Sequence, residues 1–171
     1  MTGTTDNRPI FMRPGHCAGD LLEAPDWVID RESYGCVDID AHVPDQVLNP
    51  RQQLFGGFTG TYVDMVALYT IRTLFPDRES YWITTINMRI DYLDPVTGPR
   101  MHLQGRLINQ GRSTSLVSVT FLDQQGNNLV QALEIGGARV NARLVTGGKH
   151  VFRLDWNELQ PWIESLTTAA P

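Results

Sequence analysis

One stretch of the chain, residues 55–75, constrains the fold more than any other. It has the length of a helix of about six turns, and the only charged side chain between Arg51 and Arg72 is Asp64. The residues around Asp64 are apolar on nearly every side of a helical wheel, and a helix that is apolar all round is a buried one. The sequence therefore predicts a central helix that other elements enclose.

Two features of this helix are costly. A lone carboxylate in apolar surroundings loses its hydration, so Asp64 needs a compensating interaction. Gly56, Gly57 and Gly60 lie in the first turns, where an interior glycine costs roughly 1 kcal/mol relative to alanine. The first N–H groups of a helix have no internal partner and can stabilise an oxyanion. Residues and spacing thus allow an oxyanion site at the helix tip with a catalytic carboxylate two turns later, or a structural Asp64 that hydrogen-bonds a neighbour.

The rest of the chain predicts strands rather than further long helices. Before the helix, residues 35–43 alternate between apolar and polar side chains, as a half-buried strand does. After it, strands are expected at residues 81–93, 101–110, 113–122 and 129–141, separated by clusters of turn-forming residues. One strand, one buried helix and four antiparallel strands indicate an α+β domain whose sheet wraps a single helix.

The chain of 171 residues is expected to form one domain with an extension at each end. Residues 1–18 have few apolar side chains in register, which predicts a flexible N-terminal arm. Residues 19–145 are predicted to form the domain itself. Residues 146–171 are predicted to form a C-terminal extension with a short strand and a helix.

Composition argues against several classes of function. The net charge of -5 and the lack of a Lys/Arg cluster disfavour nucleic acid as the main partner. No apolar run approaches the ~20 residues of a membrane span. The N-terminal residues lack the apolar segment of a signal peptide, so we expect a cytoplasmic location, with Cys17 and Cys36 as free thiols. The histidines and cysteines show no metal-ligand spacing, and no phosphate loop or serine-nucleophile motif occurs, so neither a metal nor a cofactor is expected.

The helix and the residues before it resemble a motif of the hotdog-fold thioesterase superfamily, and within it of the PaaI-type acyl-CoA thioesterases. In that family an Asn is followed by five residues, then His-Gly-Gly, then six residues and an Asp. Here Asn49, Phe55-Gly56-Gly57 and Asp64 fall at those spacings. The resemblance implies a hotdog fold, in which an antiparallel sheet wraps around one long central helix.

Four later segments extend the resemblance, which covers about residues 35–140. Thr84-Thr85-Ile86 and residues 90–95 are similar to the family's next strand and its Tyr-x-x-Pro end. Residues 105–112 and 121–126 are similar to its closing hairpins. Each motif alone is loose, but their order is the order of the family.

The resemblance implies an acyl-CoA thioesterase with Asp64 as general base or nucleophile. Gly56 would donate its backbone N–H to the thioester carbonyl, Asn49 would hold the attacking water or the carbonyl, and Thr85 would help to orient the water. In the family each site forms between two subunits. The resemblance therefore implies a homodimer or homotetramer with shared active sites and an acyl-CoA substrate.

Phe55 departs from the family pattern, which most often has His at this position. Its ring could pack on an acyl group, so Phe55 and Gly57 are the candidate substrate-binding residues, with ordinary packing of Phe55 as the alternative. The departure also motivates a second function, a hotdog protein that binds acyl-CoA or another apolar ligand without catalysis. A dehydratase or hydratase is disfavoured because no His lies between His42 and His102. A purely structural module leaves Asp64 and the glycine-rich tip unexplained.

Overall fold

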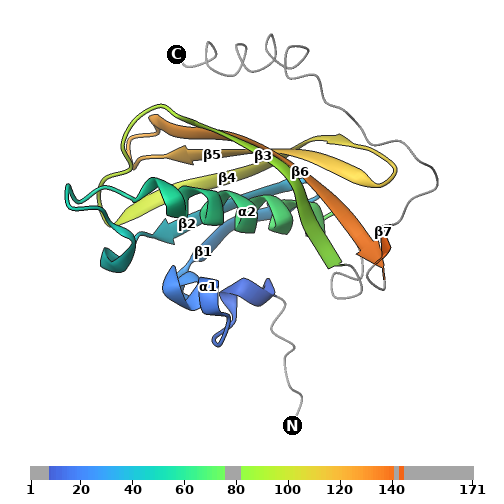
Figure 1. The fold of residues 1–171 in the computed structure, drawn as a ribbon, viewed down its shortest axis with the longest axis horizontal. Helices are drawn as coiled ribbons and strands as arrows, with labels where there is room; N and C mark the ends of the chain where they lie inside the picture. The colour runs from blue at the N-terminus through green and yellow to red at the C-terminus, as the bar shows by residue number, and fades with distance from the viewer. Residues whose placement is uncertain (1–7, 76–81, 141–142, 145–171) are drawn as a thin grey trace.

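The computed structural model describes residues 8–75, 82–140 and 143–144, and its largest element is a curved antiparallel sheet (Figure 1). Its main strands are β1 (Val28–Ser33), β2 (Cys36–His42), β3 (Trp82–Tyr92), β4 (Arg100–Gln110), β5 (Thr114–Leu122) and β6 (Asn128–Val140). Their order across the sheet is β1-β2-β4-β5-β6-β3, and the two-residue β7 (Arg143–Leu144) pairs with β6. β3 is therefore an edge strand, although it is the first strand after the helix.

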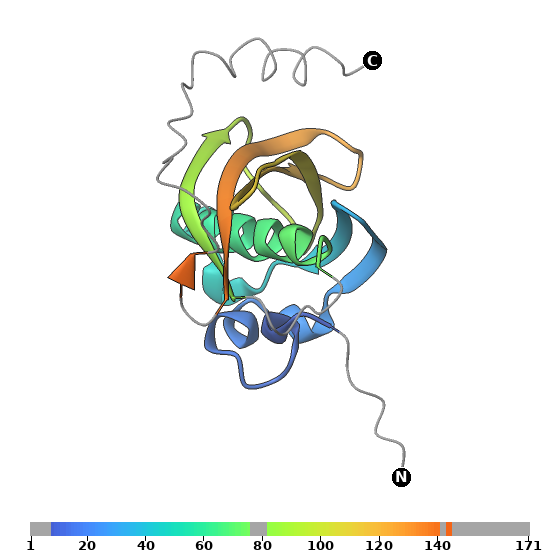
Figure 2. The ribbon, with the colours of Figure 1, turned by 90° about the vertical axis from the view of Figure 1, so that its right-hand side faces the viewer.

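The helix α2 (Gly56–Arg72) lies in the hollow of this sheet. Seen end-on, the strands curl over one side of the helix, and the N-terminal segment lies against the other side (Figure 2). Val63 and Met65 lie on nearly opposite sides of α2, and both are buried. The predicted α+β class and the sheet wrapped around one central helix are confirmed, and this enclosure explains why the helix is apolar all round.

The five strands predicted from the sequence are all present, with nearly the predicted bounds. β1 was not predicted, because its sequence shows no alternation of apolar and polar residues. Its last four residues are all exposed. The predicted C-terminal extension, residues 146–171, lies outside the described residues.

The N-terminal segment is packed rather than loose. Residues 8–27, which we call the N-terminal cap, contain the short helices η1 (Ile10–Met12), α1 (Cys17–Leu21) and η2 (Ala24–Asp26). Phe11 and Met12 are buried in the core. The Phe11 ring meets the Tyr69 ring edge-on at 6.2 Å between centroids. The flexible arm predicted for residues 1–18 is therefore wrong for residues 8–18, where two neighbouring apolar side chains without periodicity seal one side of α2.

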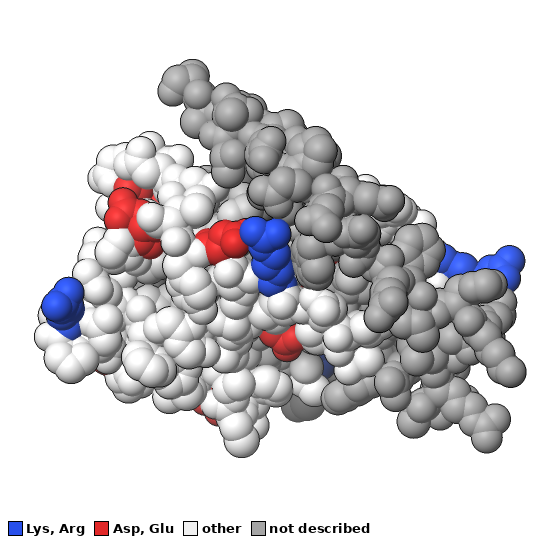
Figure 3. All heavy atoms as spheres, turned by 45° about the horizontal axis from the view of Figure 1, so that its top comes forward, with Lys and Arg blue, Asp and Glu red and all other residues white. Residues whose placement is uncertain are grey.

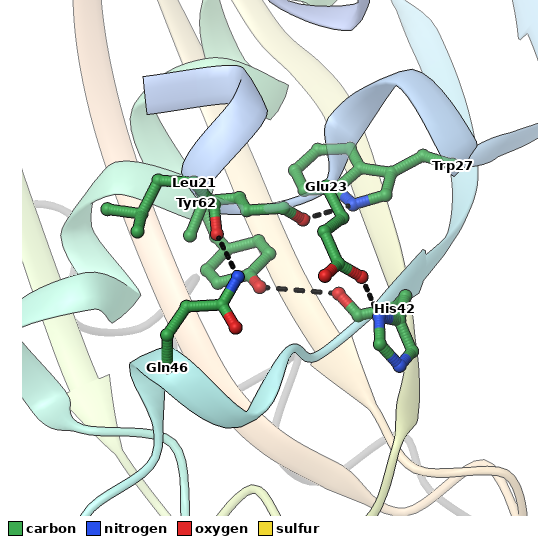
Figure 4. A network of polar contacts seen from close by, with 7 residues as sticks. Leu21, Glu23, Trp27, His42, Gln46 and Tyr62 are labelled. Carbon is green, nitrogen blue, oxygen red and sulfur yellow. Dashed lines mark hydrogen bonds and ion pairs between the residues drawn. The ribbon is translucent and has the colours of Figure 1, made fainter. Parts of the chain in front are cut away.

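A polar network fastens this cap to the end of β2 (Figure 4). Glu23 Oε2 lies 2.6 Å from His42 Nδ1, and the Tyr62 hydroxyl donates to the His42 carbonyl at 3.3 Å. Gln46 Nε2 donates to the Leu21 carbonyl at 3.1 Å. Burial, and secondly the negative charge of Glu23, raise the pKa of Tyr62 far above its ordinary value, so this phenol stays neutral. Neutral Tyr62 is thus a fixed hydrogen-bond donor between the helix and β2.

The surface has few charged clusters and several exposed apolar side chains. On the face shown in Figure 3, lysine and arginine side chains are scattered rather than gathered into a patch. None of the described helices is long and apolar enough to cross a membrane. Large exposed apolar side chains include Phe55 beside the tip of α2 and Ile86, Tyr92 and Leu93 on or next to β3. The edge strand and the helix tip therefore both present apolar surface.

Candidate functional site

The tip of α2 is open and has no polar cap. Phe55 occupies the N-cap position, its side chain makes no capping hydrogen bond, and it is 55% exposed. The N–H groups of Gly56 and Gly57, in the first turn, have no intrahelical acceptor. A Cβ on Gly57 would lie 2.7 Å from the Phe55 ring, so the ring is folded closely over this glycine. The tip thus combines free backbone donors with an exposed aromatic side chain.

Tyr92, at the end of β3, holds the tip from the other side. Its hydroxyl donates to the Gly56 carbonyl at 3.0 Å. A Cβ on Gly56 would meet the Tyr92 ring at 3.6 Å, which is an ordinary contact. The carbonyl of Gly56 is therefore engaged, while its N–H points out of the helix end.

Asn49 organises the loop that leads into the helix. Its Oδ1 accepts hydrogen bonds from the backbone N–H groups of Arg51 at 2.8 Å and Gln53 at 3.2 Å. Its Nδ2 lies 3.5 Å from Gln53 Oε1. Within the described residues these partners all lie in the loop itself, so the predicted role of Asn49 toward water or the thioester carbonyl stays a prediction.

Asp64 is half-buried and points from α2 toward β3. The Thr85 hydroxyl forms a short hydrogen bond with its Oδ1 atom. The sequence singled out both residues, and the structure brings them into direct contact. Their catalytic roles stay predictions. Asp64 differs from the expectation in one respect, because the helix leaves it partly accessible rather than enclosed.

A β-bulge in β3 is what turns Thr85 toward the helix. The register of β3 against β6 shifts between Thr85 and Asn87. Side chains of a regular strand alternate between faces, so Thr85 and Met88 would otherwise lie on opposite faces. With one extra residue, both Thr85 and the core-packed Met88 and Ile90 face α2, while Ile86 is 50% exposed. Bulges of this kind commonly re-aim a side chain at a functional site.

Glu134 is a third member of the site, and the sequence analysis missed it. It lies on β6, its side chain is fully buried, and its Oε1 atom is 3.0 Å from Thr85 Oγ1. Its Oε2 atom is also buried and has no hydrogen-bond partner among the described residues. The signal was present in the sequence, because Glu134 is the only charged residue in the run Leu129–Gly137. A lone carboxyl in an apolar segment was the same signal that identified Asp64.

The electrostatics of the site follow from this burial. Loss of hydration, and then the negative charge of Asp64, raise the pKa of Glu134 to about 9, and the hydrogen bond with Thr85 lowers it by less. Two ionised carboxylates this close repel each other, which disfavours the charged form of the more buried one. Glu134 is therefore a neutral carboxylic acid under physiological conditions.

The helix tip and Asp64 lie too far apart in one chain to act on the same atom. Eight residues separate Gly56 from Asp64, which is about 12 Å along a helix at 1.5 Å per residue. A reacting carbonyl must lie roughly 3 Å from both the base or its water and the oxyanion donors. The carboxylate and the donors can therefore serve one thioester only if they come from two chains.

No metal site accompanies these groups in the part of the chain that the structure describes. There, no cluster of three or more His, Cys, Asp or Glu side chains could hold a metal ion. Cys17 is exposed, Cys36 is half-buried, and both are free thiols.

Comparisons with known proteins agree with this architecture. A hypothetical thioesterase from Streptococcus pneumoniae TIGR4, solved with coenzyme A, has a TM-score of 0.61 at 21% identity over 68% of this chain and 88% of that chain. A protein from Streptococcus mutans UA159, bound to acetyl CoA, has a TM-score of 0.61 at 20% identity over 69% and 92%. A putative thioesterase from Ralstonia eutropha JMP134, described as phenylacetic acid degradation-related, has a TM-score of 0.63 at 23% identity over 73% and 92%.

No curated protein matches the chain. Residues 52–130, however, match the thioesterase superfamily. This segment runs from the loop before α2 to the start of β6, and it contains both Asp64 and Thr85. The chain has the hotdog fold of these structural neighbours, and the match to the thioesterase superfamily covers this segment of it.

Proposed function

We propose that this protein is an acyl-CoA thioesterase that hydrolyses its substrate by Asp64-assisted attack of water. The observation that carries the proposal is the hydrogen bond between Asp64 and Thr85 on a half-exposed face of α2. A carboxylate oriented by a fixed donor, and still reachable from outside, is what a general base requires. A purely structural aspartate would gain more from complete enclosure with its partners.

In the proposed reaction Asp64 takes a proton from water as the oxygen attacks the thioester carbonyl. Thr85 engages Oδ1, so Oδ2 is the oxygen that receives this proton. The N–H of Gly56 stabilises the tetrahedral oxyanion, and Asn49 holds the water or the carbonyl. Collapse of the intermediate breaks the carbon–sulfur bond, and the proton passes to the thiolate, which gives a carboxylic acid and free coenzyme A. Direct attack by Asp64, with later hydrolysis of the anhydride, is the other form of this mechanism.

The active unit in this proposal is a homodimer, or a homotetramer built from such dimers. The separation of about 12 Å between Gly56 and Asp64 along α2 requires groups from two chains for one site. β3 is an unpaired edge of the sheet and carries exposed Ile86, which suits pairing with the same strand of a second copy. Such pairing would join two sheets into one.

The substrate class rests on likeness to the structural neighbours and on the helix motif. The Streptococcus pneumoniae and Streptococcus mutans proteins were solved with coenzyme A and acetyl CoA. Likeness to the phenylacetic acid degradation-related protein supports a PaaI-type enzyme. Phe55 and Gly57 are proposed to contact the substrate. The cytoplasmic location expected from the sequence stays a prediction.

A hydrolysis screen tests the proposal. Acyl-CoA thioesters of increasing chain length, with aryl-acetyl thioesters included, would be incubated with the protein, and release of free thiol would be followed. We expect turnover with at least one of them and loss of that turnover in the Asp64→Asn variant. Absence of turnover across the series, with folded protein, contradicts the proposal.

A second function, acyl-CoA binding without hydrolysis, is favoured by one observation. Phe55 takes the N-cap position without any polar group, so the tip lacks the side chain that relatives place there. Binding measured by calorimetry with a non-hydrolysable acyl-CoA thioether separates the two functions. Tight binding of the thioether together with no thiol release from any thioester indicates the binding protein.

A further inference from the structure

Glu134 has no part in the mechanism described above, and a role for it in catalysis rests on the proposed function. Three polar side chains from three elements meet between α2 and the sheet. They are Asp64 from the helix, Thr85 from β3 and Glu134 from β6. The register neighbours of Glu134 are Met88 on β3 and Val117 on β5, and Asp64 is the charge that acts on it among the described residues.

The number of protons in this cluster determines which group donates each hydrogen bond. The Thr85 hydroxyl lies within hydrogen-bonding distance of both carboxyls, yet it has one proton to donate. If Thr85 donates to one carboxyl, the second contact is favourable only when the other carboxyl supplies a proton. One of the two acids must therefore be neutral, and this acid must donate its proton to the Thr85 oxygen.

Burial decides which of the two acids is neutral. Glu134 is fully buried, whereas Asp64 is partly accessible. An ionised Glu134 would leave a charged Oε2 oxygen without a partner among the described residues, and an unpaired buried charge is far more costly than an unpaired carbonyl oxygen. The rise of the Glu134 pKa to about 9 agrees with this assignment.

We propose that Glu134 is a positioning residue: as a neutral acid it donates its proton to Thr85, which then can donate only to Oδ1 of Asp64. The Thr85 hydroxyl is thereby fixed in one orientation. Oδ1 of Asp64 is fully engaged, and Oδ2 is left as the single oxygen that accepts a proton from water. Without the donor on Glu134, Thr85 is free to rotate, and Asp64 loses the restraint that selects one of its oxygens.

Two substitutions distinguish this role from simple packing. Glu134→Gln keeps the size, the neutral state and a donor toward Thr85, so turnover at neutral pH should stay within about threefold of the wild type. Glu134→Met keeps the approximate size but removes the donor, so kcat should fall by about 10- to 100-fold with little change in KM, as is typical for lost outer-shell partners. Gln131→Met is the matched control, because Gln131 is a buried polar residue on the same strand that bonds to Thr120 instead.

The pH profile gives a readout that packing alone would not move. Wild-type turnover should fall at high pH with a midpoint at about pH 9, where Glu134 ionises. This fall should disappear in Glu134→Gln and persist in Gln131→Met. Loss of turnover in Glu134→Gln as large as in Glu134→Met overturns the proposal, because an ionised Glu134 would then be required. Unchanged kcat and pH profile in Glu134→Met overturn it as well.

A spectroscopic titration separates this proposal from the proposed function. The infrared carbonyl band of a neutral buried carboxyl should be present at neutral pH, absent in Glu134→Gln, and lost in the wild type near pH 9. If the band behaves in this way but no thioester is hydrolysed, Glu134 is a neutral donor as proposed, and the proposed function is wrong. If thioesters are hydrolysed while Glu134 is ionised at neutral pH, the proposed function is supported, and the proposal that Glu134 is a neutral donor is wrong.

Discussion

At the residue scale, Phe55 is the position that departs from the His-Gly-Gly motif of the family. Its side chain is 55% exposed, forms no cap, and meets Phe58 in a T-shaped contact at 6.2 Å between centroids. We expect Phe55→His to preserve the fold and to raise turnover or leave it unchanged, because imidazole can order the helix tip and little packing is lost. Steady-state kinetics with a melting curve check this. A large loss of activity with intact folding would show that the phenyl ring itself binds substrate.

Glu134 makes stability depend on pH with a definite sign. Its pKa is raised from an ordinary value of 4.5 to about 9 in the folded protein. Between these values the folded state holds more protons than the unfolded state, so the stability present below pH 4.5 is lost as pH rises through 9. The slope from this group is at most about 1.4 kcal/mol per pH unit. Denaturant unfolding at several pH values should show this slope in the wild type and a flatter curve in Glu134→Gln.

The site residues were predictable from the sequence to different degrees. Asp64 stood out because it is the one charge in an apolar helix, and Thr85 followed from the family resemblance. Glu134 is likewise the one charge in an apolar segment, but the sequence of its strand does not reveal which residue of the neighbouring strand it contacts. The contact with Thr85 depends on a bulge in β3, and the local sequence gives no sign of that extra residue.

At the element scale, the close approach of β4 to α2 depends on Gly105. A Cβ there would lie 2.0 Å from Thr70 Oγ1, and Thr70 is held in place by a hydrogen bond to the Val66 carbonyl at 2.8 Å. We expect Gly105→Ala to lower the free energy of unfolding by about 1–3 kcal/mol, as overpacking of a core does. Adding Thr70→Ala should recover part of this loss, which a double-mutant cycle in denaturant measures.

Gly60→Ala is the control for this experiment, because a Cβ on Gly60 would meet only the Ile90 Cδ1 atom at an ordinary 3.8 Å. Its stability should be unchanged or higher by up to about 1 kcal/mol, the usual gain of alanine over glycine within a helix. If Gly105→Ala were as stable as Gly60→Ala, the packing of α2 against β4 would be looser than the structure indicates.

Most elements followed from the sequence, and the exceptions have physical reasons. The apolar helix and the alternating strands β2 to β6 were recognisable from periodicity alone. The N-terminal cap was not, because its fit depends on the contact of Phe11 with Tyr69, two residues far apart in the sequence. β1 was missed because an exposed edge strand needs no apolar alternation.

At the scale of the whole molecule, the proposed site requires two chains. We expect light scattering to show a dimer or a tetramer, and a monomer would rule out the shared site. A sharper test mixes two inactive variants, Asp64→Asn and Gly56→Pro. Proline suits the first position of a helix and removes only the N–H there, and the extended backbone of Phe55 (ψ 124°) tolerates a following proline.

Each of these variants spoils both sites of its own dimer, whereas a mixed dimer has one site with both native groups. After the two variants exchange subunits at equal concentration, activity should return to about a quarter of the wild-type value, since half the dimers are mixed and half their sites are intact. If the carboxylate and the N–H act within one chain, mixing restores nothing.

The central claim is that Asp64 is the base, and one variant tests it most directly. Asp64→Asn keeps the size and hydrogen-bonding reach of the side chain but removes the carboxylate. A general base contributes about 10²- to 10⁴-fold to rate, so the turnover number for the best acyl-CoA of the screen should fall by that factor while the substrate still binds. The melting temperature should stay the same or rise, because active-site charges often reduce stability. A turnover number within about threefold of the wild type would contradict the assignment of Asp64.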